Sequence, residues 1–97
     1  MIRIQYSLSP EFSFEVKGHA HYDVIGKDIV CSAVTAVVIG GINALENNKN
    51  MNIEVKEGLI RVKSEKSLSE KDFIVFHTIL TQLQSISEEY PNNVKIK

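Results

Sequence analysis

Two residues that can do covalent chemistry, His19 and Cys31, lie twelve positions apart in the segment KGHAHYDVIGKDIVCSAVT, residues 17–35. A thiolate is a strong nucleophile and an imidazole titrates near neutral pH, so a Cys–His pair within hydrogen-bonding distance suffices for thiol acyl transfer. Cys31 is the single cysteine of the sequence. It therefore has no intrachain disulfide partner, which fits a reducing compartment and predicts a cytoplasmic protein.

The segment after Asp28 predicts a helix that presents Cys31 in its first turn. Asp28 is a suitable N-cap, because its carboxylate can accept from the unpaired N–H groups of that turn. Cys31 then occupies the third helical position, where these N–H groups and the helix dipole favour a thiolate. We expect the same N–H groups to hold the oxyanion of a tetrahedral intermediate.

Two glycines, Gly18 and Gly26, bracket the loop that precedes this helix. Glycine adopts backbone conformations closed to other residues and suits hinge positions. We therefore expect the loop to close over a bound peptide and exclude water. The predicted loop residues are Ala20, His21, Tyr22, Asp23, Val24 and Ile25.

Thr35 follows Cys31 by one helical turn, so both side chains share a helix face. One interpretation has the Thr35 hydroxyl bonding back to the carbonyl of residue 31, and the other has it facing the reaction site. Asp23 and Asp28 are both candidates to orient His19. Capping is the preferred role for Asp28, and a solvated loop position is preferred for Asp23.

Two other interpretations of the same residues stay open. A cysteine among the apolar residues IVCSAV is commonly a small buried hydrophobe without chemistry. Alternatively, His19 and His21 with Asp23 and Cys31 supply ligand types that zinc accepts, although their spacing matches no standard zinc site.

Alternation of apolar and polar residues predicts two β-hairpins and a last strand. The strand segments are residues 2–8 and 12–17, residues 53–55 and 60–62, and the final VKIK, residues 94–97. Turns are predicted at Ser9-Pro10-Glu11 and at Glu57-Gly58, and the last strand is expected at a sheet edge.

Helical patterns occupy residues 28–47, ending at Asn47 and Asn48, and residues 69–90. In the second helix Phe73, Phe76, Leu80, Leu83 and Ser87 share the face expected to be buried. Gly40-Gly41 predicts close packing against a neighbouring element or a second copy of the chain. Strands with one apolar face need cover on that face alone. The sequence therefore predicts an α+β two-layer sandwich of order ββαββα(β), mainly antiparallel, with both helices on one face.

Composition fits one globular domain over residues 1–97. Hydrophobic residues make up 43% and charged residues 24%, which is too apolar for disorder, and the net charge is −1. Such a charge gives no basic field for nucleic acid, and no apolar run reaches the roughly 20 residues of a membrane span. The N-terminus also lacks the apolar block of a signal peptide. We therefore expect neither a nucleic-acid nor a membrane partner.

The combined pattern Gly18-His19-Ala20, a short loop, then Gly26-x-Asp28-x-x-Cys31, resembles the signature of the ribosomal-processing cysteine protease Prp family. The likeness extends over essentially the whole chain. Two departures are Thr35, where the family usually has serine, and Ser32, where it commonly has alanine. Neither removes a group that thiol chemistry requires.

The resemblance implies a small homodimeric bacterial endopeptidase that removes the N-terminal extension of a large-subunit ribosomal protein, cutting after an aromatic residue. It implies Cys31 as nucleophile, His19 as its acid and base, Asp28 at the acidic position of the motif, and the loop as a mobile cover. This mechanism needs no metal or organic cofactor. The alternatives are a non-catalytic ribosome-associated binding module with a structural Cys31, and a small zinc-binding regulator.

Overall fold

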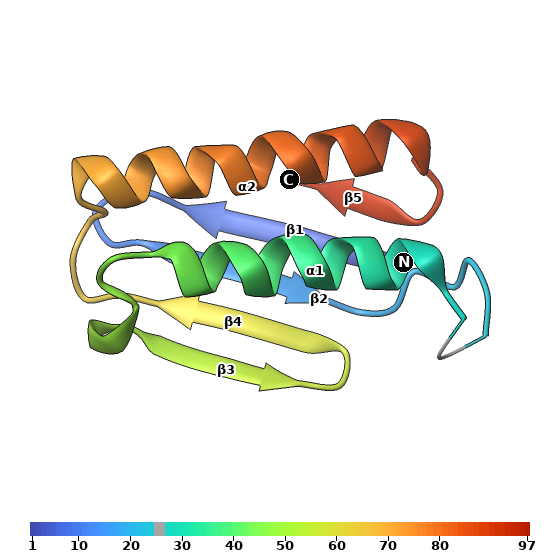
Figure 1. Ribbon diagram of the computed structural model, residues 1–97, viewed down its shortest axis with the longest axis horizontal. Helices are drawn as coiled ribbons and strands as arrows, with labels where there is room; N and C mark the ends of the chain where they lie inside the picture. Colours follow the sequence, from blue (N-terminus) through green and yellow to red (C-terminus); the bar gives the residue numbers. More distant parts are fainter. Residues whose placement is uncertain (25–26) are drawn as a thin grey trace.

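Residues 1–24 and 27–97 are described by the computed structural model, which contains the predicted succession of strands and helices (Figure 1). In chain order the elements are β1 (Ile2–Ser7), β2 (Ser13–Lys17), α1 (Ile29–Ala44), the 3-10 helix η1 (Asn48–Asn50), β3 (Asn52–Lys56), β4 (Leu59–Lys63), α2 (Glu70–Glu89) and β5 (Val94–Ile96). The predicted ββαββα order with a last strand is confirmed.

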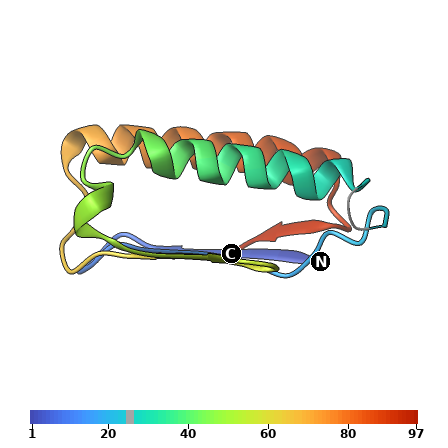
Figure 2. The same cartoon turned by 60° about the horizontal axis from the view of Figure 1, so that its bottom comes forward.

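The strands form one mixed sheet of order β3-β4-β2-β1-β5. Both hairpins are antiparallel, β2 and β4 join them antiparallel, and β5 pairs with β1 in parallel. Figure 2 shows both helices on one face of the sheet, and the other face is open. The structure is therefore the predicted two-layer α+β sandwich, with the last strand, β5, at an edge of the sheet as expected.

The hydrophobic core lies between the helices and the sheet. Strand residues alternate between buried and exposed positions, which is the pattern of a sheet covered on one face. The core residues from the central strands are Ile2, Ile4, Phe14, Val16, Ile60 and Val62; those from the helices are Val30, Val34, Val38, Ile42, Phe76, Ile79, Leu80 and Leu83.

Gly41 explains how closely the two helices approach each other. A side chain at this position would collide with Ile79 of α2, whereas a side chain at Gly40 would meet open space. The predicted close packing is thus between α1 and α2 and concerns Gly41. Glycine costs about 1 kcal/mol relative to alanine inside a helix, and at Gly41 the helix contact compensates for it.

The buried face of α2 differs from the expected one at its first turn. Phe73 is 45% exposed, whereas Asp72 and Ile79 are buried. Expecting Phe73 in the core was wrong, because the buried carboxylate of Asp72 takes the inward direction there and turns Phe73 toward solvent. In the described part of the chain, no helix combines the length and hydropathy of a membrane span.

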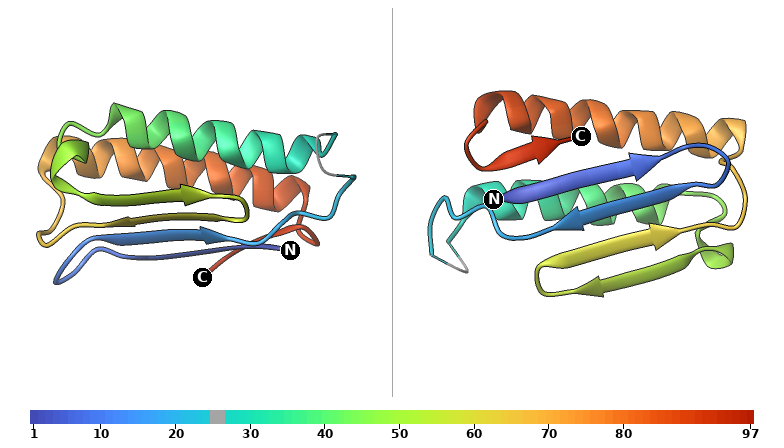
Figure 3. Two further views of the ribbon diagram at one scale, coloured as in Figure 1. Left: turned by 90° about the horizontal axis from the view of Figure 1, so that it is seen from below. Right: turned by 180° about the vertical axis from the view of Figure 1, so that it is seen from behind.

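One end of the sandwich brings distant parts of the chain together. The segment after β2, the start of α1, the β3–β4 turn and the turn before β5 all lie at this end (Figure 3). Hydrogen bonds link them: Gly18 N–H donates to Gly58 carbonyl at 2.9 Å, and Ile2 N–H donates to Asn93 carbonyl at 2.8 Å. His19 and Cys31 therefore sit where several elements meet.

Candidate active site

Asp28 begins α1 as predicted. Its Oδ1 accepts from the N–H groups of Val30 at 2.9 Å and Cys31 at 3.0 Å. Asp28 is buried, and it places Cys31 at the third position of the helix. The positive end of the helix dipole therefore lies beside the thiol.

The same Asp28 carboxylate also holds the preceding loop. Its Oδ2 accepts from the N–H groups of Tyr22 at 2.9 Å and Asp23 at 3.2 Å. Burial by itself raises the pKa of this carboxyl, but the four N–H donors outweigh burial and keep the pKa below its ordinary value of 3.8. Asp28 is thus a charged link between the loop and α1.

Occupation of these N–H groups corrects one expectation. Val30 and Cys31 donate to Asp28 Oδ1, and Ser32 N–H donates to the Asp28 carbonyl at 3.1 Å. First-turn N–H groups with a carboxylate partner do not also hold an oxyanion. The sequence indicates a capped helix, but it does not show that the cap consumes the donors.

Cys31 is half-buried and receives a backbone donor from the loop. The N–H of Ala20 lies 3.2 Å from Cys31 Sγ. Ala20 is buried, and its carbonyl accepts from Asn93 Nδ2 at 2.9 Å, so the chain after His19 is fixed from two sides. An N–H directed at sulfur stabilises negative charge on it.

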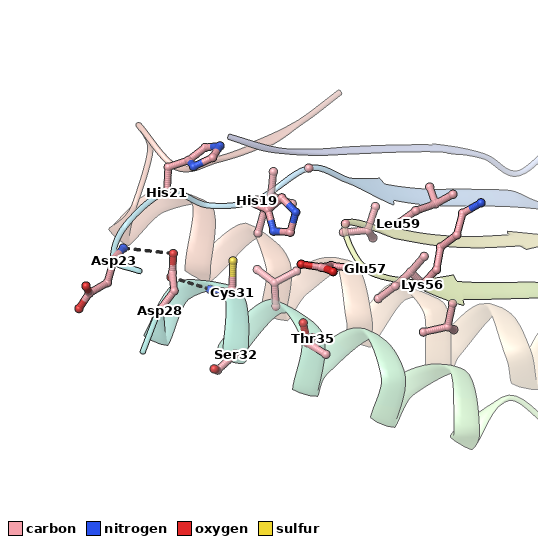
Figure 4. A pocket seen from close by; sticks show the side chains of 17 residues that line it. His19, His21, Asp23, Asp28, Cys31, Ser32, Thr35, Lys56, Glu57 and Leu59 are labelled. Carbon is pink, nitrogen blue, oxygen red and sulfur yellow. Dashed lines mark hydrogen bonds between the residues drawn. The ribbon is translucent and has the colours of Figure 1, made fainter. Parts of the chain in front are cut away.

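His19 shares a pocket with Cys31. The pocket has a volume of about 390 Å³ and lies between α1, the segment after β2 and the β3–β4 hairpin (Figure 4). Residues that line it include Gly18, Ser32, Thr35, Val55, Glu57 and Gly58. Among the described residues, the Ala20 N–H, and not His19, donates the hydrogen bond to Cys31 Sγ. Catalytic contacts commonly tighten only when substrate binds.

Gly18 has a structural reason to be glycine. Its φ is +102°, and a side chain there would collide with the backbone of Met1. The position is therefore closely packed against the start of β1. Gly26, the other bracketing glycine, lies outside the described residues, as does Ile25.

The remaining loop residues lie over the start of α1. His21 has φ 57° and is exposed, and Tyr22 makes an edge contact with Tyr90 at 5.3 Å between ring centroids. Asp23 accepts from the N–H of Val24 at 2.7 Å, and both are exposed. The loop is attached through backbone groups, which leaves these side chains accessible.

Thr35 is exposed and lines the pocket one turn after Cys31. Thr78 and Thr81 on α2 donate to the carbonyls four residues earlier, at 2.9 and 3.0 Å. Within the described residues, the Thr35 hydroxyl makes no such hydrogen bond to the Cys31 carbonyl. The structure therefore favours the interpretation in which this hydroxyl faces the pocket.

The zinc interpretation finds no support in the geometry. Within residues 1–24 and 27–97, no three His, Cys, Asp or Glu side chains are grouped as metal ligands. Cys31 also differs from a fully buried structural cysteine, because it is half-buried and opens to a pocket.

Residues outside the motif also contribute to the site, and the sequence did not predict their presence there. Gly58 approaches the His19 ring, Val55 and Glu57 line the pocket, and Asn93 holds Ala20. The sequence predicts the Glu57-Gly58 turn, and Asn93 directly precedes the predicted last strand. It contains no signal that Gly58 lies near His19 or that Asn93 binds Ala20, because both depend on strand pairing.

A thiol at a capped helix N-terminus, with an imidazole in the same pocket, is the arrangement of a cysteine peptidase. Comparison with known proteins gives the same class. The family model described as Cysteine protease Prp matches residues 1–95. A Mycoplasma genitalium protein named ribosomal processing cysteine protease Prp is 32% identical over 96 residues, covering 96% of this chain and 93% of the relative.

A Staphylococcus aureus protein of the same name is 30% identical over 83 residues, covering 81% of this chain and 78% of the relative. A crystal structure of the S. aureus protease Prp with a covalently linked product peptide superposes with a TM-score of 0.87 at 26% identity, covering 100% of this chain and 98% of that one. The chain belongs to the cysteine protease Prp family. This confirms the predicted family, fold and enzyme class.

Proposed function

We propose that this protein is an endopeptidase that removes the N-terminal extension of a large-subunit ribosomal protein, with Cys31 as nucleophile and His19 as acid and base. One observation carries the proposal: a half-buried thiol in the first turn of a capped helix receives an N–H and shares a pocket with an imidazole. The relatives are named for ribosomal processing. The S. aureus protease has been crystallised with a substrate peptide and with a covalently linked product peptide.

In the first half of the reaction, Cys31 Sγ attacks the carbonyl carbon of the scissile peptide bond and an S–C bond forms. The C–N bond then breaks, and His19 gives the proton that it has taken from the Cys31 thiol to the departing amine. The helix dipole and the Ala20 N–H stabilise the thiolate before attack. The acyl group is left on Cys31 as a thioester.

In the second half, water attacks the thioester while His19 accepts its proton. The C–S bond breaks, the carboxylic acid product leaves and the thiol is regenerated. Asp28 supports both halves by fixing Cys31 on α1 and the loop in front of it. Thr35 supplies a hydroxyl within the pocket, and Gly18 permits the close approach to Met1.

The loop of residues 20–25 serves as the cover of the bound peptide in this proposal. Its exposed side chains of His21, Tyr22, Asp23 and Val24 are free to contact substrate, and its backbone is held by Asp28. Gly26 is the proposed hinge at the end of the loop, as its place in the motif suggests.

The wider assignment follows the same family. We propose that residues 1–97 act as one domain, which the single sheet and continuous core support. The protein works as a cytoplasmic homodimer. Sedimentation equilibrium tests the assembly, and a mass of one chain at micromolar concentration would contradict it.

Peptide cleavage tests the proposed function. A peptide that spans the processed N-terminus of the ribosomal protein is offered to the wild type, Cys31→Ala and His19→Ala, with His77→Ala as a matched control. His77 is exposed on α2, away from the residues that line the pocket. We expect cleavage by the wild type and His77→Ala, with a loss of about 10³-fold or more in the other two. Unchanged cleavage by Cys31→Ala contradicts the mechanism, and no cleavage by any variant favours a binding module.

A further inference from the structure

The turn between β3 and β4 lies close to the imidazole of His19. At Gly58 a Cβ atom would lie 3.0 Å from His19 Nε2, 3.6 Å from Cε1 and 3.7 Å from Cδ2. Any side chain at position 58 would therefore press on the edge of the ring that carries Nε2. The imidazole fits in its position because residue 58 is a glycine and has no side chain.

The same glycine is linked to the chain that carries His19. Its carbonyl accepts from the Gly18 N–H at 2.9 Å, directly before His19. Strand pairing fixes the turn further, since Leu59 is opposite Lys17 on one side and Lys56 on the other. The Gly58 backbone and the His19 backbone are therefore held in one register, and the open space at Gly58 determines where the ring can lie.

We propose that Gly58 is a positioning residue, which acts through His19 by leaving room for the imidazole beside Cys31. The inference rests on the proposed role of His19 as acid and base. Proton transfer requires heavy atoms within about 3 Å of each other, and a displacement of about 1 Å can cost about 100-fold in rate. A Cβ at position 58 moves the ring by a few tenths of an ångström or rotates it.

A simpler explanation for Gly58 is its backbone conformation. Its φ is +74°, a region that favours glycine whatever surrounds it. Asparagine separates the two explanations, because it tolerates positive φ better than other residues but still carries a Cβ. If φ alone matters, Gly58→Asn leaves His19 and the reaction undisturbed. If the contact matters, Asn disturbs the ring as Ala does.

The experiment compares Gly58→Ala and Gly58→Asn with Gly40→Ala as control. A side chain at Gly40 meets nothing within 4 Å. Two readouts are measured: kcat/KM for the peptide, and the pH profile of Cys31 alkylation by iodoacetamide. We expect both Gly58 variants to lose about tenfold in kcat/KM and their alkylation profiles to move toward that of His19→Ala. Gly40→Ala should keep the wild-type values.

A double-mutant cycle tests the contact without relying on cleavage. Backbone strain from Gly58→Ala is the same with or without His19, whereas the collision with the ring disappears in the His19→Ala background. We therefore expect Gly58→Ala to lower the urea midpoint more in the wild type than in His19→Ala. Equal shifts in the two backgrounds overturn the inference, whatever the peptide assay gives.

The inference about Gly58 is also overturned if Gly58→Asn has the same kcat/KM and the same alkylation profile as the wild type. Persistent cleavage in His19→Ala instead contradicts the proposed function, while the cycle still decides whether Gly58 and His19 are in contact. The two failures are therefore distinguishable.

Discussion

The two helices begin in similar ways, each with a capping residue and a buried aspartate, but only the start of α1 belongs to the candidate active site. α1 begins with Asp28 as cap and has Cys31 at its third position, whereas α2 begins with Ser69 as cap and has Asp72 at its third position. Asp28 and Asp72 are both buried; Asp28 accepts N–H groups from the loop just before α1, and Asp72 accepts them from the segment after α1. At one end of the molecule the buried aspartate sits beside a thiol, and at the other it does not.

The residue one turn later shows the same contrast. Phe76 follows Asp72 and lies in the core, where it makes edge contacts with Phe12 and Phe14. Thr35 follows Cys31 and is exposed to a pocket. A buried carboxylate that holds a loop therefore lies near the start of both helices. The site arises where such a helix start leaves a helix face open and presents a nucleophile on it.

Replacing each aspartate by alanine should give the largest difference in activity between the two helix starts. Asp28→Ala removes the cap and the loop attachment together, and Asp72→Ala leaves the N–H groups of Glu46 and Asn47 unpaired. We expect both to lower the free energy of unfolding by about 3 kcal/mol. In contrast, kcat/KM should fall about 100-fold in Asp28→Ala and stay within about twofold in Asp72→Ala.

Urea unfolding and peptide cleavage by the fraction that remains folded check this pair of variants. Equal losses of kcat/KM would mean that cleavage depends on general stability rather than on the α1 start. Wild-type cleavage in Asp28→Ala would remove Asp28 from the site.

Asparagine at position 28 sharpens the comparison by separating the two roles of the carboxylate. The amide oxygen of Asp28→Asn can still cap α1, but its NH2 group cannot accept from Tyr22 and Asp23. We expect a stability loss of about 1–2 kcal/mol and a loss of about tenfold in kcat/KM, both smaller than for alanine. Hydrogen exchange of the Tyr22 and Asp23 amides should accelerate while those of Val30 and Cys31 stay protected. Slow exchange at all four amides would contradict the assigned role of Oδ2.

Acid should weaken the hydrogen bonds of the Asp28 carboxylate in a defined direction. The pKa of Asp28 is lower in the folded protein than its ordinary value, so folding favours the charged form. The stabilisation is complete at pH values above the unfolded pKa, near 4, and is lost as pH falls through the folded pKa. The difference in unfolding free energy between wild type and Asp28→Asn should therefore shrink below about pH 4. A difference that stays constant from pH 7 to pH 3 would be inconsistent with a lowered pKa.

The smallest expected effect concerns Thr35. Thr35→Val keeps the shape of the side chain but removes the hydroxyl from the pocket. We expect KM for the peptide to rise by about two- to fivefold, with the alkylation rate of Cys31 unchanged and Thr35→Ser close to wild type. Steady-state kinetics and iodoacetamide labelling measure these effects. A slower alkylation of Thr35→Val would instead connect the hydroxyl to the thiolate.

Local patterns were enough to predict most of the fold. Alternating residues identify the hairpins, Asp28 identifies the start of α1, and one-sided strands require helices on one face. The parallel pairing of β5 with β1 and the inward direction of Asp72 depend on tertiary packing. Because no local pattern encodes such packing, Phe73 was placed in the core when it is exposed.

The site divides in the same way. His19, Asp28 and Cys31 belong to one motif whose residue types and spacing are visible in the sequence. Gly58 and Asn93 reach the site through strand pairing and the chain end, 39 and 74 residues after His19. The periodicity of apolar and polar residues predicts local structure only, so it does not predict contacts between residues this far apart in the sequence. Occupation of the α1 N–H groups by Asp28 is likewise a result of geometry.

Covalent labelling tests the central claim most directly. A peptide chloromethyl ketone that ends at the residue before the scissile bond is incubated with the protein, and the modified residue is located by mass spectrometry. We predict one label per chain on Cys31, complete loss of cleavage on labelling, and slower labelling of His19→Ala. A label on another residue, or cleavage that continues after Cys31 is fully labelled, would contradict the account.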